Sequence, residues 1–494
     1  MTVTGKIITA VTIIVLSCSG SAWSERKAEE YFESGKLAQR AGNHKAAVDH
    51  FTKAVRMGLS DPDLFFRRGL TYEKLGDNIQ AINDYTKSLQ LDPNLATAFN
   101  NRGSAYYRLG EYDKAIEDYG RAIDLNPSYA LAYYNRGNAF YGKGDHTEAI
   151  KDFSRAVDLN PRDPDAHNNR GWALLQEQKA EQSIKDFDRA IKLNPKYTIA
   201  YYNRGNARLV TGDVQGAIRD LSKALELDPD YTLAYFQRGN AYSRLAQWDN
   251  AVADYNKVIL ISPSHSEAFN NRGWAFYNKG NNALAVRDFS KALTLNPNLA
   301  KAYINRGWVF KNHGECARAV QDFSRALELE GSSRSILGLR ASCYVDQGMR
   351  DLAMRDLEKA LAQGDESDLL VLLGCLKEQA GDYPGAIALF SKLVSLMPED
   401  PMPYYYLGVA LGKKGRFRDS IAELSKSIDR DDKFREAYVK RGIAYEFSGD
   451  FGRARTDFSR ALNLPEGGTV PRMPCTTVNT MNLRKTLSAW QSGG

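Results

Sequence analysis

The sequence predicts an all-α solenoid of about thirteen helix–turn–helix repeats, each 34 residues long. Prolines recur every 34 residues from Pro93 to Pro297, and glycines recur with the same period from Gly35 to Gly307. The glycine series resumes at Gly374, after the loss of one residue near position 366. A fixed period of this length is typical of solenoids, in which each repeat buries its apolar face against its neighbours.

Each repeat is predicted to consist of a helix A and a helix B. A second glycine, such as Gly42, follows the first by seven residues and closes helix A with a left-handed residue. Helix B carries a small residue and then a large apolar one, such as Ala47 and Phe51, and a proline ends it. Because a glycine inside a helix costs about 1 kcal/mol relative to alanine, we expect close contact between the two helices to offset that cost.

The repeats divide into a regular and a degenerate part. Residues 28–333 hold nine regular repeats, and residues 334–468 hold four degenerate ones. The degenerate repeats covering about 334–434 lose the proline and become apolar on the face predicted to bind partners. This second part is open to a separate partner or to self-association. In the tail, residues 469–494, a capping helix for the last hairpin is suggested by the spacing of Leu483, Leu487 and Trp490.

Residues 1–22 are predicted to be an export signal. Lys6 precedes a mostly apolar stretch from Ile7 to Leu16, which is too short to span a bilayer of roughly 30 Å. Two processing sites compete. Cys18 lies in a sequence that resembles a bacterial lipobox and would carry a lipid, whereas cleavage after Ala22 would release a soluble protein. An uncleaved anchor is the third alternative.

The 34-residue period with these glycines, small residues and prolines resembles the tetratricopeptide repeat family. The resemblance covers nearly the whole chain. It implies a right-handed superhelix in which helix A of every repeat lines a concave groove that binds peptides or proteins.

One departure from the family pattern concerns charge. The residue before the helix A glycine is usually Leu in the family and is mostly Arg here, and the residue sixteen positions later is usually Tyr and is mostly Asp. Where the Arg is missing the Asp is missing too, as at Leu373 and Leu389. We interpret the pairs as ion pairs between helices A and B; the alternative is a phosphate-binding stripe of arginines. The pairs are Arg68/Asp84, Arg102/Asp118, Arg136/Asp152, Arg170/Asp186, Arg204/Asp220, Arg238/Asp254, Arg272/Asp288, Arg306/Asp322, Arg340/Asp356 and Arg441/Asp457.

The positions that line the groove in the family hold asparagines and aromatic residues here. A side-chain amide offers a donor and an acceptor to a peptide backbone without regard to its sequence, and Tyr and Trp add contact area at low entropic cost. The arrangement resembles the asparagine ladder in the repeats of O-linked N-acetylglucosamine transferase; the alternative is that the asparagines contact only water. The predicted peptide-binding residues are Asn100, Asn101, Tyr107, Tyr134, Asn135, Asn138, Asn168, Asn169, Trp172, Tyr202, Asn203, Asn206, Gln237, Asn240, Asn270, Asn271, Trp274, Asn305 and Trp308.

Other classes of site find little support in the sequence. The net charge of +6 is small, and basic and acidic residues alternate, which argues against a nucleic-acid partner. No cysteine–histidine cluster has metal-ligand spacing, and no nucleophile, base or phosphate-binding loop stands out, so we expect no metal, no cofactor and no catalytic residue. A disulfide between Cys343 and Cys375 is left open.

These observations predict a non-catalytic scaffold that binds extended peptide or protein partners. We expect it to be exported to a bacterial cell envelope, either periplasmic or tethered to a membrane through an N-terminal lipid or anchor. An alternative is a subunit that recruits substrates for an enzyme, such as a glycosyltransferase, carried on another chain; a third is a purely structural spacer.

Overall fold

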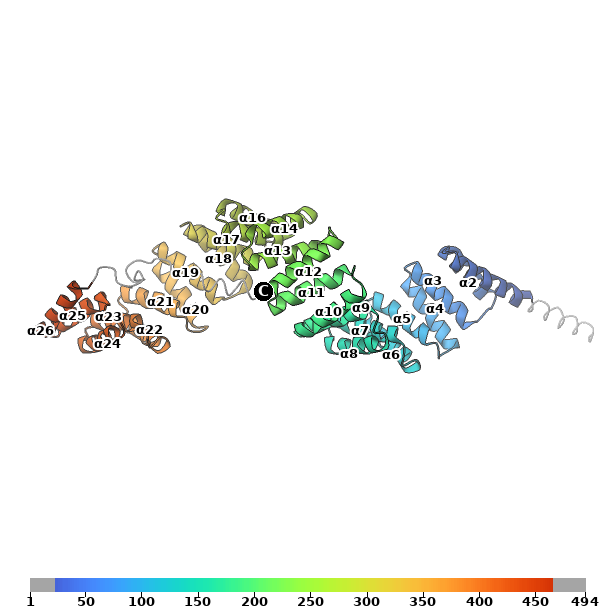
Figure 1. The fold of residues 1–494 in the computed structure, drawn as a ribbon, viewed down its shortest axis with the longest axis horizontal. Helices are drawn as coiled ribbons and strands as arrows, with labels where there is room; N and C mark the ends of the chain where they lie inside the picture. Colours follow the sequence, from blue (N-terminus) through green and yellow to red (C-terminus); the bar gives the residue numbers. More distant parts are fainter. Residues whose placement is uncertain (1–22, 465–494) are drawn as a thin grey trace, which may run out of the picture. The chain divides into compact units, whose positions relative to one another are not determined.

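The computed structural model describes residues 23–464, and this part of the chain consists of helices joined by short turns, with no strand. The fold is therefore the all-α repeat solenoid that the sequence predicts. Contacts between Cα atoms divide the chain into two compact units, residues 1–241 and residues 242–494. Both are built from the same antiparallel helix pairs (Figure 1).

Helix A and helix B alternate along the described residues. The first helix A covers residues 23–40. The other A helices are α3 (Pro62–Lys74), α5 (Ala96–Arg108), α7 (Ala130–Lys143), α9 (Pro164–Gln176), α11 (Thr198–Thr211), α13 (Thr232–Arg244), α15 (Ser266–Asn278), α17 (Ala300–Asn312), α19 (Arg334–Asp346), α21 (Ser367–Gln379), α23 (Pro401–Lys413) and α25 (Arg435–Phe447). The B helices are α2 (His44–Arg56), α4 (Asn78–Leu91), α6 (Tyr112–Leu125), α8 (His146–Leu159), α10 (Ala180–Leu193), α12 (Val214–Leu227), α14 (Trp248–Ile261), α16 (Asn282–Leu295), α18 (Cys316–Glu330), α20 (Arg350–Leu361), α22 (Tyr383–Leu396), α24 (Phe417–Arg430) and α26 (Phe451–Leu462).

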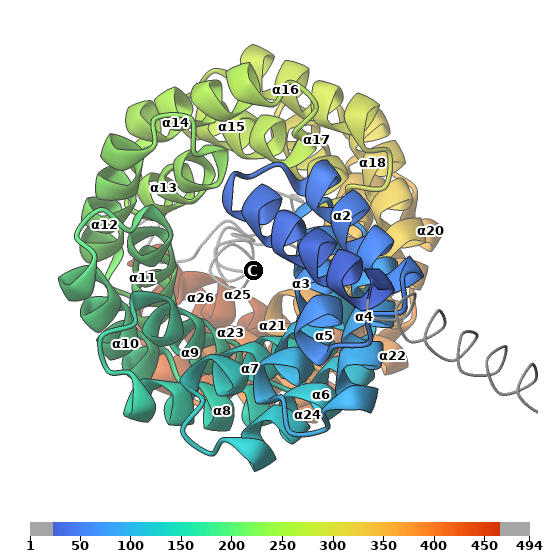
Figure 2. The same cartoon turned by 90° about the vertical axis from the view of Figure 1, so that its right-hand side faces the viewer.

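Within the N-terminal unit the two sets of helices form two layers. Figure 2 shows α5, α7, α9 and α11 on the inner side of the curve and α6, α8, α10 and α12 on its outer side. The predicted binding residues that belong to this unit lie on its A helices.

The turn between the two helices depends on backbone conformation. Gly144 and Gly212 end α7 and α11 with φ of 89° and 85°, in the left-handed region that favours glycine. Two repeats place another residue there: Gln178 has φ of 59° and Ala246 has φ of 55°. Helix B then begins with a cap in many repeats, as where the Asp145 side chain accepts a hydrogen bond from the Glu148 N–H.

The predicted contact at the helix A glycine is confirmed. A Cβ atom built on Gly137 would lie 2.8 Å from Cε1 of Phe153, whose ring is 1% exposed. The same relation joins Gly69 to Tyr85 and Gly307 to Phe323. The glycines therefore allow an aromatic ring of helix B to lie directly against the backbone of helix A.

Several predictions fall on residues 1–22 and 465–494, which lie outside the described part of the chain. These are the export signal, lipidation of Cys18, cleavage after Ala22, and the capping helix with Leu483, Leu487 and Trp490. The division of the repeats at residue 333 also stays a prediction. Among residues 23–464, no helix is both long and apolar enough to cross a membrane.

Candidate peptide-binding surface

Arginines of the A helices form two-pronged ion pairs with aspartates of the B helices. In each pair Nε donates to Oδ2 and Nη2 donates to Oδ1, at 2.5–2.9 Å, and the aspartate is buried. This confirms the ion-pair interpretation and argues against a phosphate-binding stripe, because each guanidinium already holds a carboxylate. The pairs with this geometry are Arg68/Asp84, Arg102/Asp118, Arg136/Asp152, Arg170/Asp186, Arg204/Asp220, Arg272/Asp288, Arg306/Asp322, Arg340/Asp356 and Arg441/Asp457.

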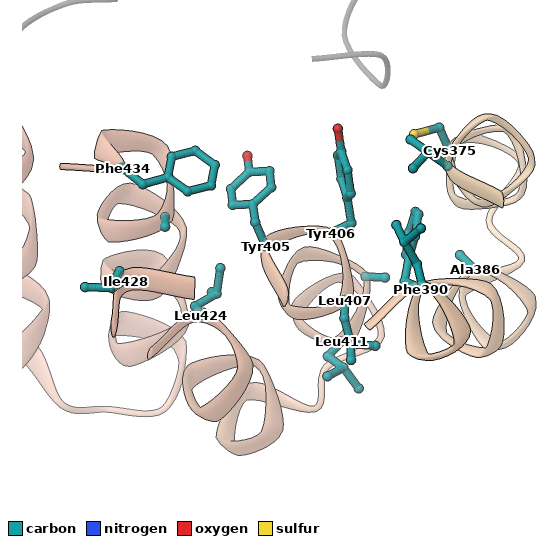
Figure 3. Close-up of a cluster of buried hydrophobic side chains, with 14 of the residues drawn as sticks. Cys375, Ala386, Phe390, Tyr405, Tyr406, Leu407, Leu411, Leu424, Ile428 and Phe434 are labelled. Carbon is teal, nitrogen blue, oxygen red and sulfur yellow. The ribbon is translucent and has the colours of Figure 1, made fainter. Parts of the chain in front are cut away.

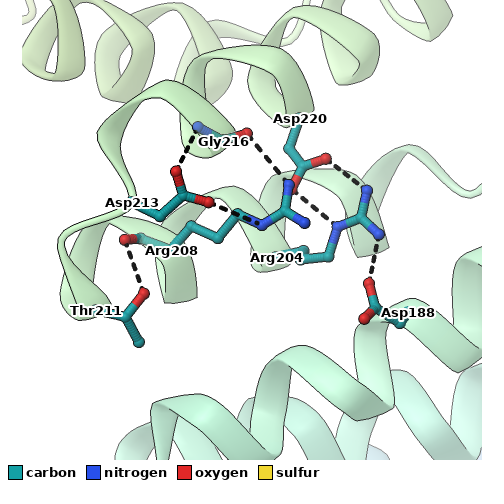
Figure 4. A network of polar contacts seen from close by, with 7 residues as sticks. All are labelled: Asp188, Arg204, Arg208, Thr211, Asp213, Gly216 and Asp220. Carbon is teal, nitrogen blue, oxygen red and sulfur yellow. Dashed lines mark hydrogen bonds and ion pairs between the residues drawn. The ribbon is translucent and has the colours of Figure 1, made fainter.

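All of these arginines except Arg136, and Arg238 as well, also bind the preceding repeat, which the sequence reasoning missed. Their remaining nitrogen, Nη1, donates to a polar side chain sixteen positions earlier, at 2.5–3.4 Å. Figure 4 shows this for Arg204, which holds Asp220 on one side and Asp188 on the other. An arginine that makes both kinds of contact thus connects three helices, whereas Arg136 follows Gly120, which has no side chain to accept a hydrogen bond. The acceptors are Thr52, Thr86, Ser154, Asp188, Ser222, Asn256, Ser290, Ser324 and Ser425.

Aromatic rings complete the surroundings of these arginines. In most repeats the guanidinium carbon lies 5.3–5.8 Å from the centroid of a ring three residues earlier, such as Phe65 below Arg68 or Tyr303 below Arg306. Hydrogen bonding to Asp152 raises the pKa of Arg136 further above its ordinary value. The arginine side chains are therefore fixed and charged, and they support the A helices from behind the inner surface.

On the inner surface, asparagines of successive repeats bond to one another. Asn135 donates through Nδ2 to Oδ1 of Asn100 at 3.0 Å. Two other pairs repeat this geometry at the same distance, Asn203 with Asn168 and Asn305 with Asn270. The accepting asparagine in turn donates to its own neighbour in the chain, Asn101, Asn169 or Asn271, at 3.0–3.1 Å.

Tyrosines and tryptophans join the same network. Nδ2 of Asn169 donates both to the Tyr134 hydroxyl at 3.0 Å and to Oδ1 of Asn138 at 2.9 Å. The indole N–H of Trp172 donates to the Tyr141 hydroxyl at 2.5 Å. In the C-terminal unit Trp308 repeats this contact with the Tyr277 hydroxyl at 3.2 Å. Direct hydrogen bonds therefore hold side chains of α7, α9, α11 and α17 against those of the preceding A helix.

The predicted peptide-binding residues separate into two groups by exposure. One group is buried and orients its neighbours instead of presenting a surface: Asn100, Asn168, Asn203, Asn270 and Trp308. The others are half-buried, apart from Tyr107, which is 37% exposed. The half-buried residues are Asn101, Tyr134, Asn135, Asn138, Asn169, Trp172, Tyr202, Asn206, Gln237, Asn240, Asn271, Trp274 and Asn305.

One amide oxygen in this surface has no partner. Oδ1 of Asn206 is shielded from solvent and accepts no hydrogen bond, although the equivalent Asn138 accepts one from Asn169. In the next repeat the position of Asn169 is taken by Gln237, whose own Oε1 accepts from Asn240 at 3.2 Å. The ladder of amides is therefore interrupted at this repeat.

Cysteine and metal chemistry is limited in the described residues. Cys343 is a free buried thiol, whereas Cys375 is disulfide-bonded, so the two are not joined to each other. Burial raises the pKa of the Cys343 thiol above its ordinary value, which keeps it protonated. No group of three or more His, Cys, Asp or Glu side chains within residues 23–464 is arranged to hold a metal ion.

Comparisons with protein-family models agree with the repeat geometry. A model described as "TPR repeat" matches residues 74–110, 103–144 and 137–178. Models described as "Tetratricopeptide repeat" match residues 168–232, 371–432 and 405–469, residues 266–299, and residues 221–253. Together these matches cover more than half of the chain.

Two similar proteins come from mammals. The mouse "Tetratricopeptide repeat protein 36" is 33% identical over 141 residues, which are 26% of this chain and 75% of that protein. Its human counterpart is 29% identical over 107 residues, which are 21% of this chain and 57% of that protein. The chain thus spans little more than half the length of the human protein.

Solved structures give weaker likenesses. The crystal structure of YrrB, described as "a TPR protein with an unusual peptide-binding site", has 25% identity and a TM-score of 0.34; the match covers 37% of this chain and 95% of that one. Yeast Tom70 has 18% identity and a TM-score of 0.37, over 80% of this chain and 97% of that one. TM-scores below 0.5 carry no argument about function. The family matches, the mouse relative and the glycine-based hairpins agree, and the chain belongs to the tetratricopeptide repeat family, whose members generally mediate interactions between proteins.

Proposed function

We propose that the inner surface of α5, α7, α9 and α11 binds an extended peptide segment of a partner protein and that the chain acts as a scaffold. The observation that carries this proposal is the set of hydrogen bonds between asparagines of successive A helices. These bonds fix the orientation of half-exposed amides before any partner arrives. Fixed side chains lose less conformational entropy on binding, which favours affinity.

The amides keep hydrogen-bonding capacity for a partner. Asn135 uses one N–H on Asn100, so its oxygen and its second N–H can bind a peptide N–H and a peptide C=O. Asn169 uses both N–H groups and accepts one hydrogen bond from Asn168, which leaves one lone pair of its oxygen. Such groups recognise backbone atoms, so we expect tolerance of many side chains in the partner.

The expected affinity is modest. Each hydrogen bond contributes about 0.5–1.5 kcal/mol net, whereas association costs roughly 4–15 kcal/mol in lost motion. Burial of the aromatic side chains of Tyr107, Tyr134 and Trp172 against the peptide must therefore supply much of the favourable binding free energy. We therefore expect dissociation constants on the order of micromolar for a single peptide, which corresponds to about −8 kcal/mol.

Variants that test this surface have to preserve the hydrogen bonds between the asparagines of successive A helices. Alanine at Asn135 or Asn203 would remove the donor to a buried oxygen and would destabilise the fold by about 1–3 kcal/mol. Asn138→Asp keeps the acceptor that Asn169 needs, removes the N–H donors and adds a negative charge. Combined with Tyr107→Ser, it changes partly exposed residues and keeps the hydrogen bond from Asn169.

The full chain would be used to select binders from a displayed library of random linear peptides, and dissociation constants would be measured by fluorescence anisotropy. The double variant should bind the selected peptides at least tenfold more weakly with unchanged helicity. Asn126→Asp, an exposed change in the turn after α6 that keeps its acceptor role toward Ser128, should bind like the wild type. Equal binding by all three proteins would exclude this surface.

We further propose that the protein acts in a bacterial cell envelope. The support is the N-terminal sequence, with one early charge, a short apolar stretch and small residues. Fractionation of cells that express the full chain should place it outside the cytoplasm, and a cytoplasmic pool alone would contradict the proposal. Cys18→Ser should release the protein from membranes if Cys18 is lipidated; unchanged fractionation would leave cleavage after Ala22 or an anchor.

A further inference from the structure

Two free thiols lie together where α18 packs against α19. Cys316 is the first residue of α18 and is 7% exposed, and Cys343 lies within α19 and is 0% exposed. Both belong to one apolar cluster, which joins α17, α18 and α19 and includes Trp308 and Phe323. Packing between two successive repeats therefore brings together two nucleophilic side chains.

Hydrogen bonds connect these thiols to each other and to α19. The Cys316 thiol donates to Oδ2 of Asp346, with Sγ and Oδ2 3.6 Å apart, and Asp346 lies about one helical turn after Cys343. The Cys343 thiol in turn hydrogen-bonds to Cys316. A disulfide needs two sulfur atoms about 2.05 Å apart. Thiols in hydrogen-bond contact are one short side-chain movement from that distance.

The two cysteines occur together at facing positions of a single junction. The positions equivalent to Cys316 in other repeats hold residues of many kinds, whereas those equivalent to Cys343 are mostly alanine: Ala105, Ala139, Ala173, Ala207, Ala241 and Ala275. An apolar role needs no pair of thiols, because Val214 and Ala241 fill the same two positions within an apolar cluster. The paired occurrence, in a chain with five cysteines, therefore points to chemistry between the two sulfurs.

Cys375 is not available to either thiol. Figure 3 shows its side chain beside Phe390 and near Tyr406, in a different apolar cluster that runs from α21 to α26. Cys375 is already disulfide-bonded, whereas Cys316 and Cys343 are free. Among the described residues, Cys316 and Cys343 can thus pair only with each other.

We propose that Cys316 and Cys343 form a redox-controlled site, whose oxidation by a small-molecule or protein disulfide ties α18 to α19. Cys316 attacks the external disulfide, and one half of the oxidant leaves as a thiol. Cys343 then attacks the mixed disulfide at Cys316, and the second half leaves. The two protons of the protein thiols pass to the two leaving sulfurs, and two electrons pass from the protein to the oxidant.

The surroundings of the two thiols assign the attacking role to Cys316. Burial raises the pKa of both thiols above the ordinary value. The hydrogen bond between the thiols and the positive charge of Lys311 lower the pKa of Cys316, whereas the hydrogen bond raises the pKa of Cys343 further. Cys316 therefore ionises more readily, and the thiolate is the nucleophile. Its place in the first turn of α18 gives access, because helix ends open more readily than helix centres.

The disulfide would strengthen a junction that lacks a feature of the regular repeats. Residues 331–333 join α18 to α19 without the proline that recurs from Pro93 to Pro297, and Ser333 makes no side-chain cap for α19. A cross-link removes conformational freedom from the unfolded junction, and coupling between repeats is local. Oxidation would therefore stiffen α18 and α19 in particular. This inference rests on residues separate from those of the proposed function, and either can fail alone.

The disulfide is tested by peptide mapping of the purified full chain, equilibrated either with glutathione disulfide or with dithiothreitol. Each sample is unfolded, alkylated without further reduction and digested with trypsin. The oxidised sample should yield residues 312–318 linked to residues 341–350, and the reduced sample should yield both peptides in alkylated form. Two alkylated thiols after oxidation, or a link from either thiol to another cysteine, would overturn the proposal.

Single variants separate the two roles. With glutathione disulfide, Cys343→Ala should stop at a mixed disulfide between glutathione and Cys316, because the second protein thiol is missing. Cys316→Ala should leave the buried Cys343 as a free thiol. Alanine suits both positions, since Ala180 and Ala207 occupy them in another repeat. Glutathione attached to Cys343 but not to Cys316 would contradict the assigned order.

Hydrogen exchange tests the effect on the junction. In the wild type, backbone amides of α18 and α19 should exchange about tenfold more slowly, or slower still, after oxidation than after reduction. Amides of α5 and α6 should exchange equally in both states and serve as the internal reference. The double variant Cys316→Ala with Cys343→Ala should not respond to either treatment. Equal exchange of α18 and α19 in the two states of the wild type would contradict the proposed control of this junction.

Discussion

Arg170 binds both carboxylate oxygens of Asp186, with Nη2–Oδ1 at 2.6 Å and Nε–Oδ2 at 2.8 Å, while its Nη1 lies 3.4 Å from the hydroxyl of Ser154 in the preceding repeat. His167 contacts the same aspartate, with Nδ1 3.4 Å from Oδ1. The Arg170 side chain thus joins the two helices of its own hairpin and also joins that hairpin to the preceding repeat. Because coupling in such arrays is between nearest neighbours, local changes are best measured by hydrogen exchange of the affected hairpin.

Arg170→Leu should destabilise the hairpin of α9 and α10. Asp186 is 5% exposed, and the variant leaves it without its cation. Removing one partner of a fully buried pair costs about 3–5 kcal/mol; Arg170 retains some solvent contact, so we expect about 2–3 kcal/mol. The double variant Arg170→Leu with Asp186→Tyr restores the usual family pair and should recover most of the loss. Arg189→Leu, on the exposed side of α10, is the control. A double variant no more stable than the single one would contradict the pairing.

Gly120→Ser should add a missing contact. Gly120 occupies the position that holds a hydroxyl or another acceptor in the other repeats, and a Cβ atom there would lie 3.7 Å from Nη1 of Arg136. A serine hydroxyl on that carbon can reach the guanidinium. The free energy of unfolding would be compared between serine and alanine at position 120, with the Arg136/Asp152 pair present and with it removed. The difference between the two comparisons is the coupling between the hydroxyl and the ion pair, and it should be about 0.5–1.5 kcal/mol. A coupling near zero would show that the hydroxyls do not support the arginines.

Gln178→Gly and Ala246→Gly should each stabilise the array by about 1 kcal/mol. Both residues have positive φ, 59° and 55°, which is unfavourable for residues with a Cβ atom. Urea-induced unfolding followed by circular dichroism would measure the gain. The reciprocal control is Gly144→Ala, where φ is 89°, which should lose stability by a similar amount. If the glycine variants were less stable, side-chain contacts at these turns would outweigh the backbone strain.

Gly137→Ala should destabilise the hairpin of α7 and α8 by about 1–3 kcal/mol, because the new methyl group would overlap the buried ring of Phe153. Adding Phe153→Leu should recover part of the loss, since the repeat with Gly205 uses Leu221 at that position with more room. Thermal unfolding would compare the three proteins. If Gly137→Ala were as stable as the wild type, α7 and α8 could move apart to make room for the methyl group without loss of stability.

Asp186 should make the α9–α10 hairpin sensitive to acid. Burial raises the pKa of this carboxyl, but hydrogen bonds from Arg170 and His167 outweigh burial and hold the pKa below its ordinary value. A lowered folded-state pKa adds stability above the unfolded pKa of about 3.9, and this stability is lost as the pH falls through the folded value. The difference in stability between wild type and Asp186→Asn, measured at pH 7, 5 and 3.5, should therefore shrink only below about pH 4. A constant difference would contradict this assignment.

Much of the fold follows from local patterns in the sequence. The glycines at 35, 69, 103 and onward marked helix A, and the left-handed turn was evident from glycines such as Gly144. The Arg–Asp pairs were identified because both residues change together within one chain. The acceptor sixteen residues before these arginines, a hydroxyl in most repeats and Asp188 or Asn256 in two, has the same periodicity. Gly120 breaks it beside Arg136, so this signal was present in the sequence as well.

Tertiary structure decided what repeat position alone could not. The sequence determined which residues lie on helix A, because the 34-residue period fixes their place within each repeat. Packing between successive A helices decided that Asn100 and Asn168 are buried acceptors while Asn135 and Asn169 stay half-exposed. It also decided that the residues from Leu369 to Leu376 in α21 are all buried. The physical reason is that exposure depends on atoms from other parts of the chain, whose approach is not encoded in the period of a single repeat.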